Sequence, residues 1–322
     1  MYILACDGGA TKTEFLLVDE AGKVYHHEAF PGLVFGALGR EGFAREMKAT
    51  LLSFFEKAKV MPVAVESAIF GMTNVGEIKD AELHMQAAIS AVLSGAAITV
   101  VNDAVVGWAG SLAGAPGVNV VAGTGSIAYG ESKIGKKGRA GGWMIRFSDE
   151  GSCSWIGAQL LAVFFKQADG RLEKTPLYEI VRNAFAIEED MEIVEPILAG
   201  AAKDDAKLAE LQRLALLAYE KDDPHAKEIY TRAAKELAEL VFALKRRLCF
   251  SSEEALLVSY SGGLFRAGDC IMHPFQKEIE QRNGMLLSPK YPPLLGALIY
   301  ILRDIMQQEQ LEEFCKTVTE QL

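Results

Sequence analysis

The stretch Asp7-Gly8-Gly9-Ala10-Thr11-Lys12-Thr13 decides the fold of this chain, together with a second stretch of similar composition, Ala122-Gly123-Thr124-Gly125-Ser126. Each follows a short apolar run, residues 2–6 and 118–121, that is typical of a β-strand. Glycine lets the backbone approach an anion closely, and consecutive amides in a turn form an anion-binding concavity. Two such turns facing each other would hold a polyphosphate, which makes ATP the first ligand to consider.

Several side chains of the two turns could contact phosphate or its metal. Hydroxyl donors are supplied by Thr11, Thr13, Thr124 and Ser126. Lys12 adds a positive charge or points into solvent, and Asp7 could hold Mg²⁺ through water, because Mg²⁺ takes few carboxylates. Taken alone, either stretch is equally well explained as an ordinary tight turn. Neither fits the P-loop or the dinucleotide-binding pattern, so a Walker-type NTPase and an NAD enzyme are disfavoured.

Composition narrows the class of protein. The chain has 322 residues, 50% of them hydrophobic, which is ample for a large core and suggests about two domains. Its net charge of −10 argues against nucleic acid and an anionic membrane as partners. No apolar run approaches the roughly 20 residues of a membrane span, and Asp7 comes too early for a secretory signal. The five cysteines are scattered, which predicts neither a zinc site nor disulfides. We expect a cytoplasmic protein with reduced thiols.

The order of predicted elements indicates a duplicated α/β architecture. Strands are expected at residues 2–6, 13–19, 23–27, 63–71 and 97–101, and helices at 42–60 and 81–93. This βββαβαβ order is the half-unit of the actin-like, ribonuclease H-like ATPase fold. Residues 118–130 repeat its strand–turn–strand opening, a helix is expected at 154–166, and helical pattern dominates 175–248. A strand at 256–261 and a helix at 294–307 follow.

We therefore expect two similar domains around a central cleft, 1–115 and 116–304, the second with a helical insertion. A C-terminal helix at about 305–322 is expected to pack back on the first domain.

The motifs, taken in order, resemble a known family. Besides the two turns they are Val101-Asn102-Asp103-Ala104, Gly141-Gly142-Trp143, Asp149-Glu150-Gly151-Ser152, Gly262-Gly263-x-Phe265 and Pro293-Leu294-x-Gly296-Ala297. The set is similar to that of the N-acetylglucosamine kinase and BadF-type ATPase family of the actin-like superfamily, over nearly the whole chain. The resemblance implies that both glycine turns hold the ATP phosphates and that Gly262, Gly263 and Phe265 lie beside the adenosine.

The resemblance also assigns the chemistry. In family kinases the aspartate that matches Asp103 accepts the proton of the attacking sugar hydroxyl, while phosphoryl transfer otherwise asks for positioning and charge neutralisation. A helix N-cap is the alternative role for Asp103. By the same resemblance, Asn102, Gly141, Gly142, Trp143 and Asp149 contact the sugar. Trp143 could stack on a pyranose face or belong to the core, where we also expect Trp108 and Trp155.

Two segments depart from the family pattern. Family members carry an asparagine in the turn after the third strand, where this chain has Val34, so its preferred sugar can differ. Ser148 replaces a common glycine, and Arg146 adds a cation near the expected acceptor site. One hypothesis is that Arg146 reads an acidic acceptor such as a lactyl ether; the other is that it is a surface residue.

Three functions compete. The first is an ATP-dependent kinase for an amino sugar, with a small-molecule sugar acceptor as its partner and a homodimer as one option for its assembly. The second is an ATP-hydrolysing activator of a radical dehydratase or reductase, which needs cysteine ligands for an iron–sulfur cluster. Val120, Val121 and Ala122 stand where such an activator has a cysteine. The third is a non-catalytic sugar- or nucleotide-sensing domain, against which Asp7 and Asp103 argue.

Overall fold

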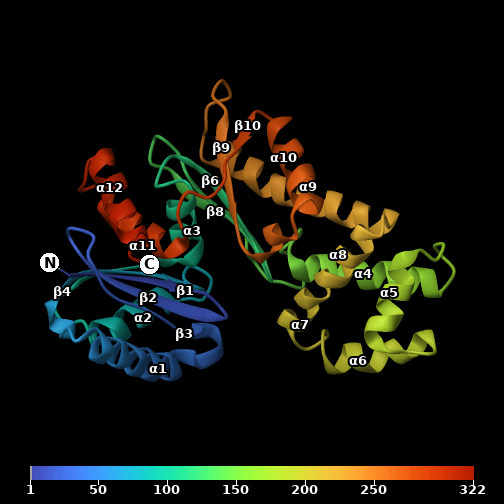
Figure 1. Cartoon of the computed structure of the whole chain (residues 1–322), viewed down its shortest axis with the longest axis horizontal. Helices are drawn as coiled ribbons and strands as arrows, with labels where there is room; N and C mark the ends of the chain where they lie inside the picture. Colours follow the sequence, from blue (N-terminus) through green and yellow to red (C-terminus); the bar gives the residue numbers. More distant parts are fainter. Residues whose placement is uncertain (1) are drawn as a thin grey trace. The chain divides into compact units, whose positions relative to one another are not determined.

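The computed structural model describes residues 2–322, and the chain divides into two compact units. Unit 1 comprises residues 2–115 and Pro289–Leu322, and unit 2 comprises Pro116–Ser288. Each unit is built on one five-stranded mixed sheet (Figure 1). The C-terminal segment of unit 1 thus begins at Pro289, before the expected residue 305.

Unit 1 has the strand order β3-β2-β1-β4-β5. Its elements are β1 (Tyr2–Gly8), β2 (Lys12–Asp19), β3 (Val24–Pro31), α1 (Phe35–Ala58), η1 (Pro62–Ala64), β4 (Val65–Met72), α2 (Ala81–Ser90), β5 (Ala97–Asn102), α3 (Asp103–Ser111), α11 (Pro293–Leu302) and α12 (Gln308–Thr319). The first three strands pair antiparallel, whereas β4 and β5 run parallel to β1. The carboxyl ends of β1, β4 and β5 therefore lie along one edge.

Helices cover both faces of this sheet. In Figure 1, α1 and α2 lie on one side, and α3 and α11 on the other. A non-helical Gly39, with φ 65° and ψ 176°, interrupts α1, which explains why regular helical spacing appears only from residue 42. Between α3 and α11 the backbones touch, because a Cβ at Gly296 would lie 2.0 Å from the carbonyl oxygen of Val106. This close packing fixes α3, and with it the residue at the start of that helix.

Unit 2 repeats the layout with the order β10-β9-β6-β7-β8. Its elements are β6 (Gly117–Ala122), β7 (Ser126–Glu131), β8 (Lys137–Gly141), α4 (Cys153–Ala168), α5 (Pro176–Phe185), η2 (Asp190–Ile193), α6 (Val194–Ala199), α7 (Asp205–Glu210), α8 (Gln212–Glu220), α9 (Pro224–Arg247), β9 (Leu256–Ser261), η3 (Gly263–Ala267), α10 (Asp269–Glu280) and β10 (Gly284–Leu286). The strands correspond one to one with those of unit 1. The predicted duplication is present in the two sheets.

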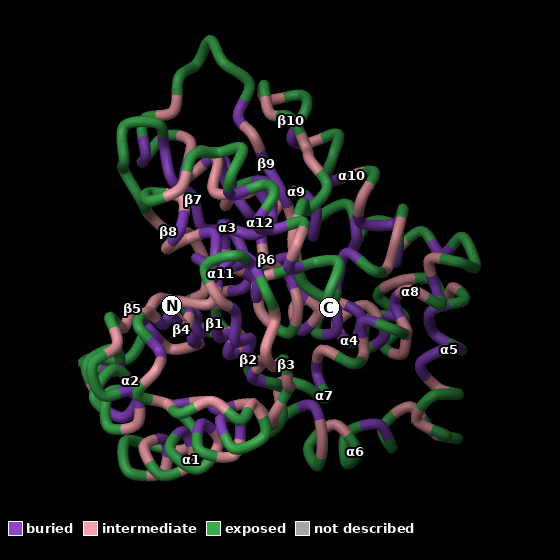
Figure 2. Tube along the Cα trace, turned by 60° about the vertical axis from the view of Figure 1, so that its left-hand side comes forward, coloured by how far each residue is buried: buried purple, intermediate pink, exposed green. Residues whose placement is uncertain are grey.

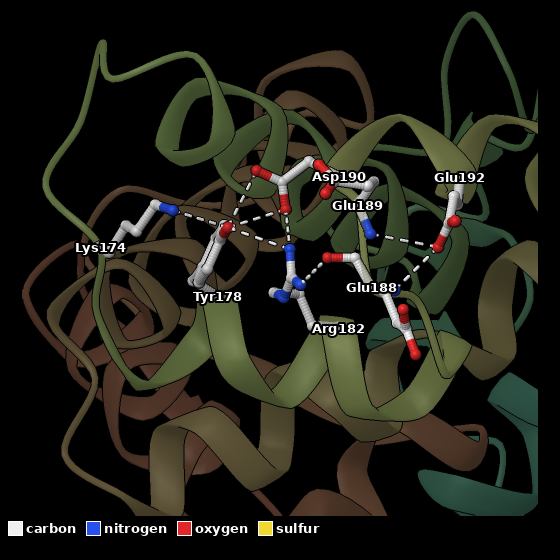
Figure 3. Close-up of polar contacts among 7 residues, drawn as sticks. All are labelled: Lys174, Tyr178, Arg182, Glu188, Glu189, Asp190 and Glu192. Atoms are coloured by element: carbon white, nitrogen blue, oxygen red, sulfur yellow. Dashed lines mark hydrogen bonds and ion pairs between the residues drawn. The ribbon is translucent and has the colours of Figure 1, made fainter.

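The expected helical region forms α5 to α9 and carries a polar network of its own. Figure 3 shows Asp190 between Tyr178 and Arg182 of α5. The Tyr178 hydroxyl donates to the Asp190 carboxylate at 2.7 Å and accepts a hydrogen bond from Lys174 Nζ at 2.6 Å. Arg182 pairs with the same carboxylate. The network connects η2 to α5, and its charged groups pair with one another. We therefore assign it a structural role.

Burial follows the layers. Figure 2 shows buried residues along the central strands, while the outer turns of α1 are exposed. Tightly packed aromatic rings of Phe15, Phe54 and Phe70 fill the core between the unit 1 sheet and α1. Within residues 2–322, no helix has the length and apolar character that a bilayer crossing demands.

Candidate functional site

Unit 1 places two carboxylates at the carboxyl ends of parallel strands. Asp7 lies near the end of β1, and Asp103 directly follows β5 as the first residue of α3. The strand between them, β4, pairs its Gly71 with Asp7 and its Met72 with Asn102. Both carboxylates are therefore at the same edge of the sheet, where α/β proteins bind ligands.

Asp103 has the surroundings of a proton acceptor. Its Oδ1 and the Oδ1 of Asn102 each accept a hydrogen bond from the amide of Ala104, at 3.0 Å. Asn102 is the N-cap residue of α3, so the alternative role considered for Asp103 is filled by its neighbour. Loss of solvation raises the pKa of Asp103 from 3.8 to about 7, with the charges of Asp7 and Glu77 adding to it. A carboxyl group that titrates near neutral pH suits general base chemistry.

Asp7 is the candidate ligand for a metal ion. Loss of solvation and the charge of Glu14 raise its pKa to about 6, while Lys12 acts to lower it. Lys12 itself is 60% exposed and pairs with Glu14 at 2.5 Å. Among residues 2–322 no group of three or more His, Cys, Asp or Glu side chains could hold a metal ion. One carboxylate fits Mg²⁺, which takes its other ligands from phosphate and water.

The turn between β1 and β2 leaves backbone donors open. The amide of Gly9 donates to the carbonyl of Lys12 at 3.0 Å, and that of Gly32 donates to the carbonyl of Thr11 at 3.1 Å. Within the described residues the amides of Ala10 and Thr11 donate no hydrogen bond. Two adjacent open amides are the arrangement that binds an anion.

Other residues at this turn contact the protein interior and stabilise the conformation of the turn. Thr13 is fully buried, and its Oγ1 accepts a hydrogen bond from the amide of Leu33 at 3.0 Å. A Cβ at Gly8 would lie 2.4 Å from Met72 Sδ and 3.1 Å from the carbonyl oxygen of Gly71, so a larger residue there would displace the Met72 side chain. Thr11 is exposed and is the hydroxyl that a ligand can reach.

The turn between β6 and β7 in unit 2 has the same character. Its Gly123 amide donates to the carbonyl of Gly125 at 2.9 Å. The first amides of α4, from Cys153 and Ser154, donate to the carbonyls of Gly123 and Thr124 at 2.9 and 3.3 Å. Thr124 is exposed, and its amide and that of Gly125 donate no hydrogen bond within residues 2–322. The turn thus presents two amides and one hydroxyl.

Asp149 and Ser126 hold this second turn in place. Asp149 is 6% exposed, has φ 58°, and its Oδ2 accepts a hydrogen bond from the amide of Ser126 at 3.3 Å. A Cβ at Gly125 would lie 2.2 Å from that same Oδ2. The Ser126 hydroxyl donates to the carbonyl of Glu150 at 2.9 Å. Both residues were predicted as ligand contacts, and both brace the turn.

A second pair of glycines lies beside this turn. A Cβ at Gly262, where φ is 99°, would lie 2.3 Å from the carbonyl oxygen of Ala122. A Cβ at Gly123 would lie 4.0 Å from the amide nitrogen of Gly263. Phe265 is buried, with its ring packed against two other aromatic rings. Unit 2 therefore gathers the motifs predicted for phosphate and adenosine at the ends of β6 and β9.

The segment after β8 is open to solvent. Gly141 and Gly142 have φ 74° and 64°, and the amide of Gly142 donates to the carbonyl of Ser126 at 2.9 Å. Trp143 is 78% exposed, and its ring centroid lies 5.7 Å from the guanidinium carbon of Arg139. The alternative that Trp143 belongs to the core is wrong.

The other predicted tryptophans differ from each other. Trp108 is fully buried, as expected, whereas Trp155 is only partly buried. Arg146 pairs with Asp205 at 2.8 Å and donates to the carbonyl of Ala201 at 3.2 Å. Of the two hypotheses for Arg146, these contacts favour the surface residue over the reader of an acidic acceptor, because the guanidinium is partly exposed and already paired.

Asn74 and Glu77, in the loop between β4 and α2, belong to none of the sequence motifs. Asn74 has φ 70° and accepts a hydrogen bond from the amide of Gly36 at 2.9 Å. Glu77 accepts hydrogen bonds from Asn74 and from Asn102. Their only signal in the sequence is a polar pair, three residues apart, after an apolar strand.

Comparison with known proteins gives a family. The model of the BadF/BadG/BcrA/BcrD ATPase family matches residues 5–300. A Clostridium acetobutylicum N-acetylmuramic acid/N-acetylglucosamine kinase is 32% identical over 63% of this chain, a match that spans 66% of that protein, just under two thirds of its length. An N-acetyl-D-glucosamine kinase of Dictyostelium discoideum is 26% identical over 93% of this chain and 97% of its own length.

Solved structures give the fold. A Chromobacterium violaceum protein assigned as an N-acetylglucosamine kinase has a TM-score of 0.72 at 25% identity, covering 92% of this chain and 98% of its own. A ROK family glucokinase of Streptomyces griseus, solved with glucose and AMPPNP, has a TM-score of 0.55 at 15% identity, covering 94% of this chain and all of its own. The predicted actin-like α/β fold is confirmed, as is the resemblance to the family.

Proposed function

Because this chain belongs to the BadF/BadG/BcrA/BcrD ATPase family, we propose that it is an ATP-dependent kinase that phosphorylates a hydroxyl of an amino sugar. Two relatives whose names specify N-acetylglucosamine support the sugar class. The observation that carries the proposal is Asp103, whose pKa is raised to about 7 and which lies at the ligand-binding edge of the unit 1 sheet. A sensing protein would have no use for such a base.

Each glycine turn has backbone donors suited to phosphate. In unit 1 the open amides of Ala10 and Thr11 bind phosphate oxygens, and in unit 2 those of Thr124 and Gly125 do so. The remaining predicted ATP-binding residues are Gly8, Gly9, Lys12, Thr13, Gly123, Ser126, Gly262, Gly263 and Phe265. Four of these residues, Gly8, Thr13, Ser126 and Phe265, are packed against the rest of the protein. They therefore contribute to ATP binding indirectly, by supporting the conformation of the glycine turns and of the segment after β9.

Asp7 would hold Mg²⁺, through water, at the first turn. Bound there, the ion would neutralise phosphate charge as it develops during transfer. Loss of solvation and the charge of Glu14 both disfavour the ionised form of Asp7, and a bound cation would offset both effects.

Asp103 acts on the acceptor. Its carboxylate accepts the proton of the sugar hydroxyl, the hydroxyl oxygen forms a bond to the γ-phosphorus, and the bond from that phosphorus to the bridging oxygen breaks, releasing ADP. Such general base help contributes about 10²–10⁴-fold. Asn102 keeps Asp103 at the start of α3 through the capping hydrogen bond.

The sugar-contacting roles of Gly141, Gly142, Trp143 and Asp149 stay predictions. Trp143 is exposed, so its ring can stack on a pyranose face. The Asp149 carboxylate instead accepts a hydrogen bond from the Ser126 amide at the end of the β6–β7 turn. A homodimer and a cytoplasmic location also stay predictions. The activator function is not favoured, because β6 carries no cysteine before the turn.

Replacement of the base tests the proposal. Asp103→Asn should lower sugar-dependent ADP release by about 10²–10⁴-fold while ATP binding, measured by calorimetry, stays within about twofold. Glu66→Gln, an exposed change at the other end of β4, is the control and should leave both unchanged. Turnover retained in Asp103→Asn would remove Asp103 from its role.

A further inference from the structure

The loop between β4 and α2 carries a carboxylate that no motif includes. Glu77 Oε1 lies 3.4 Å from Asn102 Nδ2, and its Oε2 lies 3.2 Å from Asn74 Nδ2. Asn102 Nδ2 also donates to the carbonyl of Val75 at 3.0 Å. Because Asn102 caps α3, Glu77 is joined through one side chain to the helix that begins with Asp103.

The second partner of Glu77 connects it to a different part of unit 1. Asn74 Oδ1 accepts the amide of Gly36, in the first turn of α1. That turn begins directly after Val34, the residue that stands in place of the asparagine of the family pattern. Val34 has no polar side-chain group. The amide and carboxylate groups beside this turn are instead supplied by Asn74 and Glu77 of the β4–α2 loop.

The electrostatic surroundings of Asp103 are negative. Asp7 faces it from β1 and Glu77 from the β4–α2 loop, and both charges raise its pKa. The helix packed against α3, α11, contains no charged residue. With the charge of Asp7 offset by its Mg²⁺, the charge of Glu77 remains beside Asp103, and it would repel a carboxylate on a hydroxyl acceptor bound there.

Access to Glu77 is provided by a surface cavity. Residues Gly76–Leu83 line a cavity of about 520 Å³, and Glu77 is one of the exposed residues in it. A small polar molecule can thus reach the Glu77 carboxylate without unfolding the loop.

We propose that Glu77 is the residue that selects the acceptor by charge, favouring a neutral or cationic hexosamine over one that carries a carboxylate. It also acts as a positioning residue, since it holds Asn102 and Asn74. This inference rests on the proposed kinase function. It contradicts the hypothesis of an acidic acceptor read by Arg146, whose guanidinium is already paired with Asp205.

The first test does not depend on activity. Carbon-13 NMR of the Asp103 carboxyl group, titrated without substrates, should show a lower pKa in Glu77→Gln than in wild type. Glu77→Asp, which keeps the charge, should restore most of the shift, and Glu66→Gln should leave the pKa unchanged. An unchanged Asp103 pKa in Glu77→Gln would show that the two carboxylates do not interact and would overturn the proposal.

The second test compares acceptors. Wild type should use N-acetylglucosamine and glucosamine with higher kcat/KM than N-acetylmuramic acid, which carries a lactyl carboxylate. In Glu77→Gln the kcat/KM for N-acetylmuramic acid, relative to N-acetylglucosamine, should rise by about three- to tenfold. A merely structural role would lower kcat/KM for all sugars equally.

The outcomes separate the two proposals. Turnover of N-acetylglucosamine by wild type with an unchanged ratio in Glu77→Gln would overturn the role of Glu77 alone. Absence of turnover with every sugar in wild type would overturn the kinase function and acceptor selection together, and the NMR titration would still report the coupling of Glu77 to Asp103.

Discussion

Replacing Asp103 by asparagine should stabilise unit 1 at the same time as it stops transfer. The folded protein raises the pKa of this carboxyl from 3.8 to about 7, so the folded state disfavours its ionised form. Wild type therefore loses stability as the pH rises from about 4 to about 7, and the loss is complete above pH 7. Asparagine keeps the shape of the side chain and carries no charge.

The pKa difference sets the size of the effect. A rise from 3.8 to about 7 corresponds to at most about 4 kcal/mol of unfolding free energy. We expect Asp103→Asn to be more stable than wild type by about 2–4 kcal/mol at pH 8. The gain should shrink by about 2–3 kcal/mol at pH 5, where Asp103 of the folded wild type is protonated.

Tryptophan fluorescence can follow unit 1 alone. Trp108 is fully buried in unit 1, and the other two tryptophans, Trp143 and Trp155, are in unit 2. Urea unfolding of Trp143→Phe/Trp155→Phe protein, with and without Asp103→Asn, measures the difference at each pH. Glu66→Gln is the control and should change stability by less than about 0.5 kcal/mol. A variant that is less stable at pH 8, or equally shifted at both pH values, would refute the reasoning.

Three further predictions concern the turns and the packing of α3. Gly125→Ala places a Cβ 2.2 Å from the Asp149 carboxylate and should weaken ATP binding at least about tenfold by calorimetry, and unchanged affinity would remove the turn from the site. Thr124→Val should lower kcat/KM for ATP while changing urea stability by less than about 0.5 kcal/mol, and the reverse pattern would make it a structural residue. Gly296→Ala should cost about 1–3 kcal/mol of unit 1 stability. Gly42→Ala, at a partly exposed position of α1 where a Cβ meets only the Leu38 side chain at 3.4 Å, should cost nothing; equal effects would contradict the packing.

The fold was predictable because its signals are local. An apolar run followed by a glycine turn and a second apolar run specifies each opening hairpin, and the two copies in one chain indicate the duplication. The motif order then predicted the family, which the family model confirms.

Side-chain direction was less predictable. Thr13 and Ser126 were expected to face phosphate. Thr13 is the second residue of β2 and Ser126 the first of β7, and both are buried, as are Phe15 and Ala128 two residues further along. Reading the period of two along each strand would have placed them inside.

The pair Asn74 and Glu77 was hidden for a different reason. A loop has no periodicity, and their partners, Gly36 and Asn102, are distant in sequence. Only the folded sheet, which sets β4 between β1 and β5, brings this loop to Asp103.

The central claim is that the γ-phosphate of ATP passes to an amino sugar. The most direct measurement is the ratio of sugar phosphate, counted by mass spectrometry, to ADP released by purified protein with ATP, Mg²⁺ and N-acetylglucosamine or glucosamine. We predict one sugar phosphate for each ADP, and ADP formation that depends on the sugar. ADP formed at the same rate without sugar, and with no phosphorylated sugar, would contradict the account.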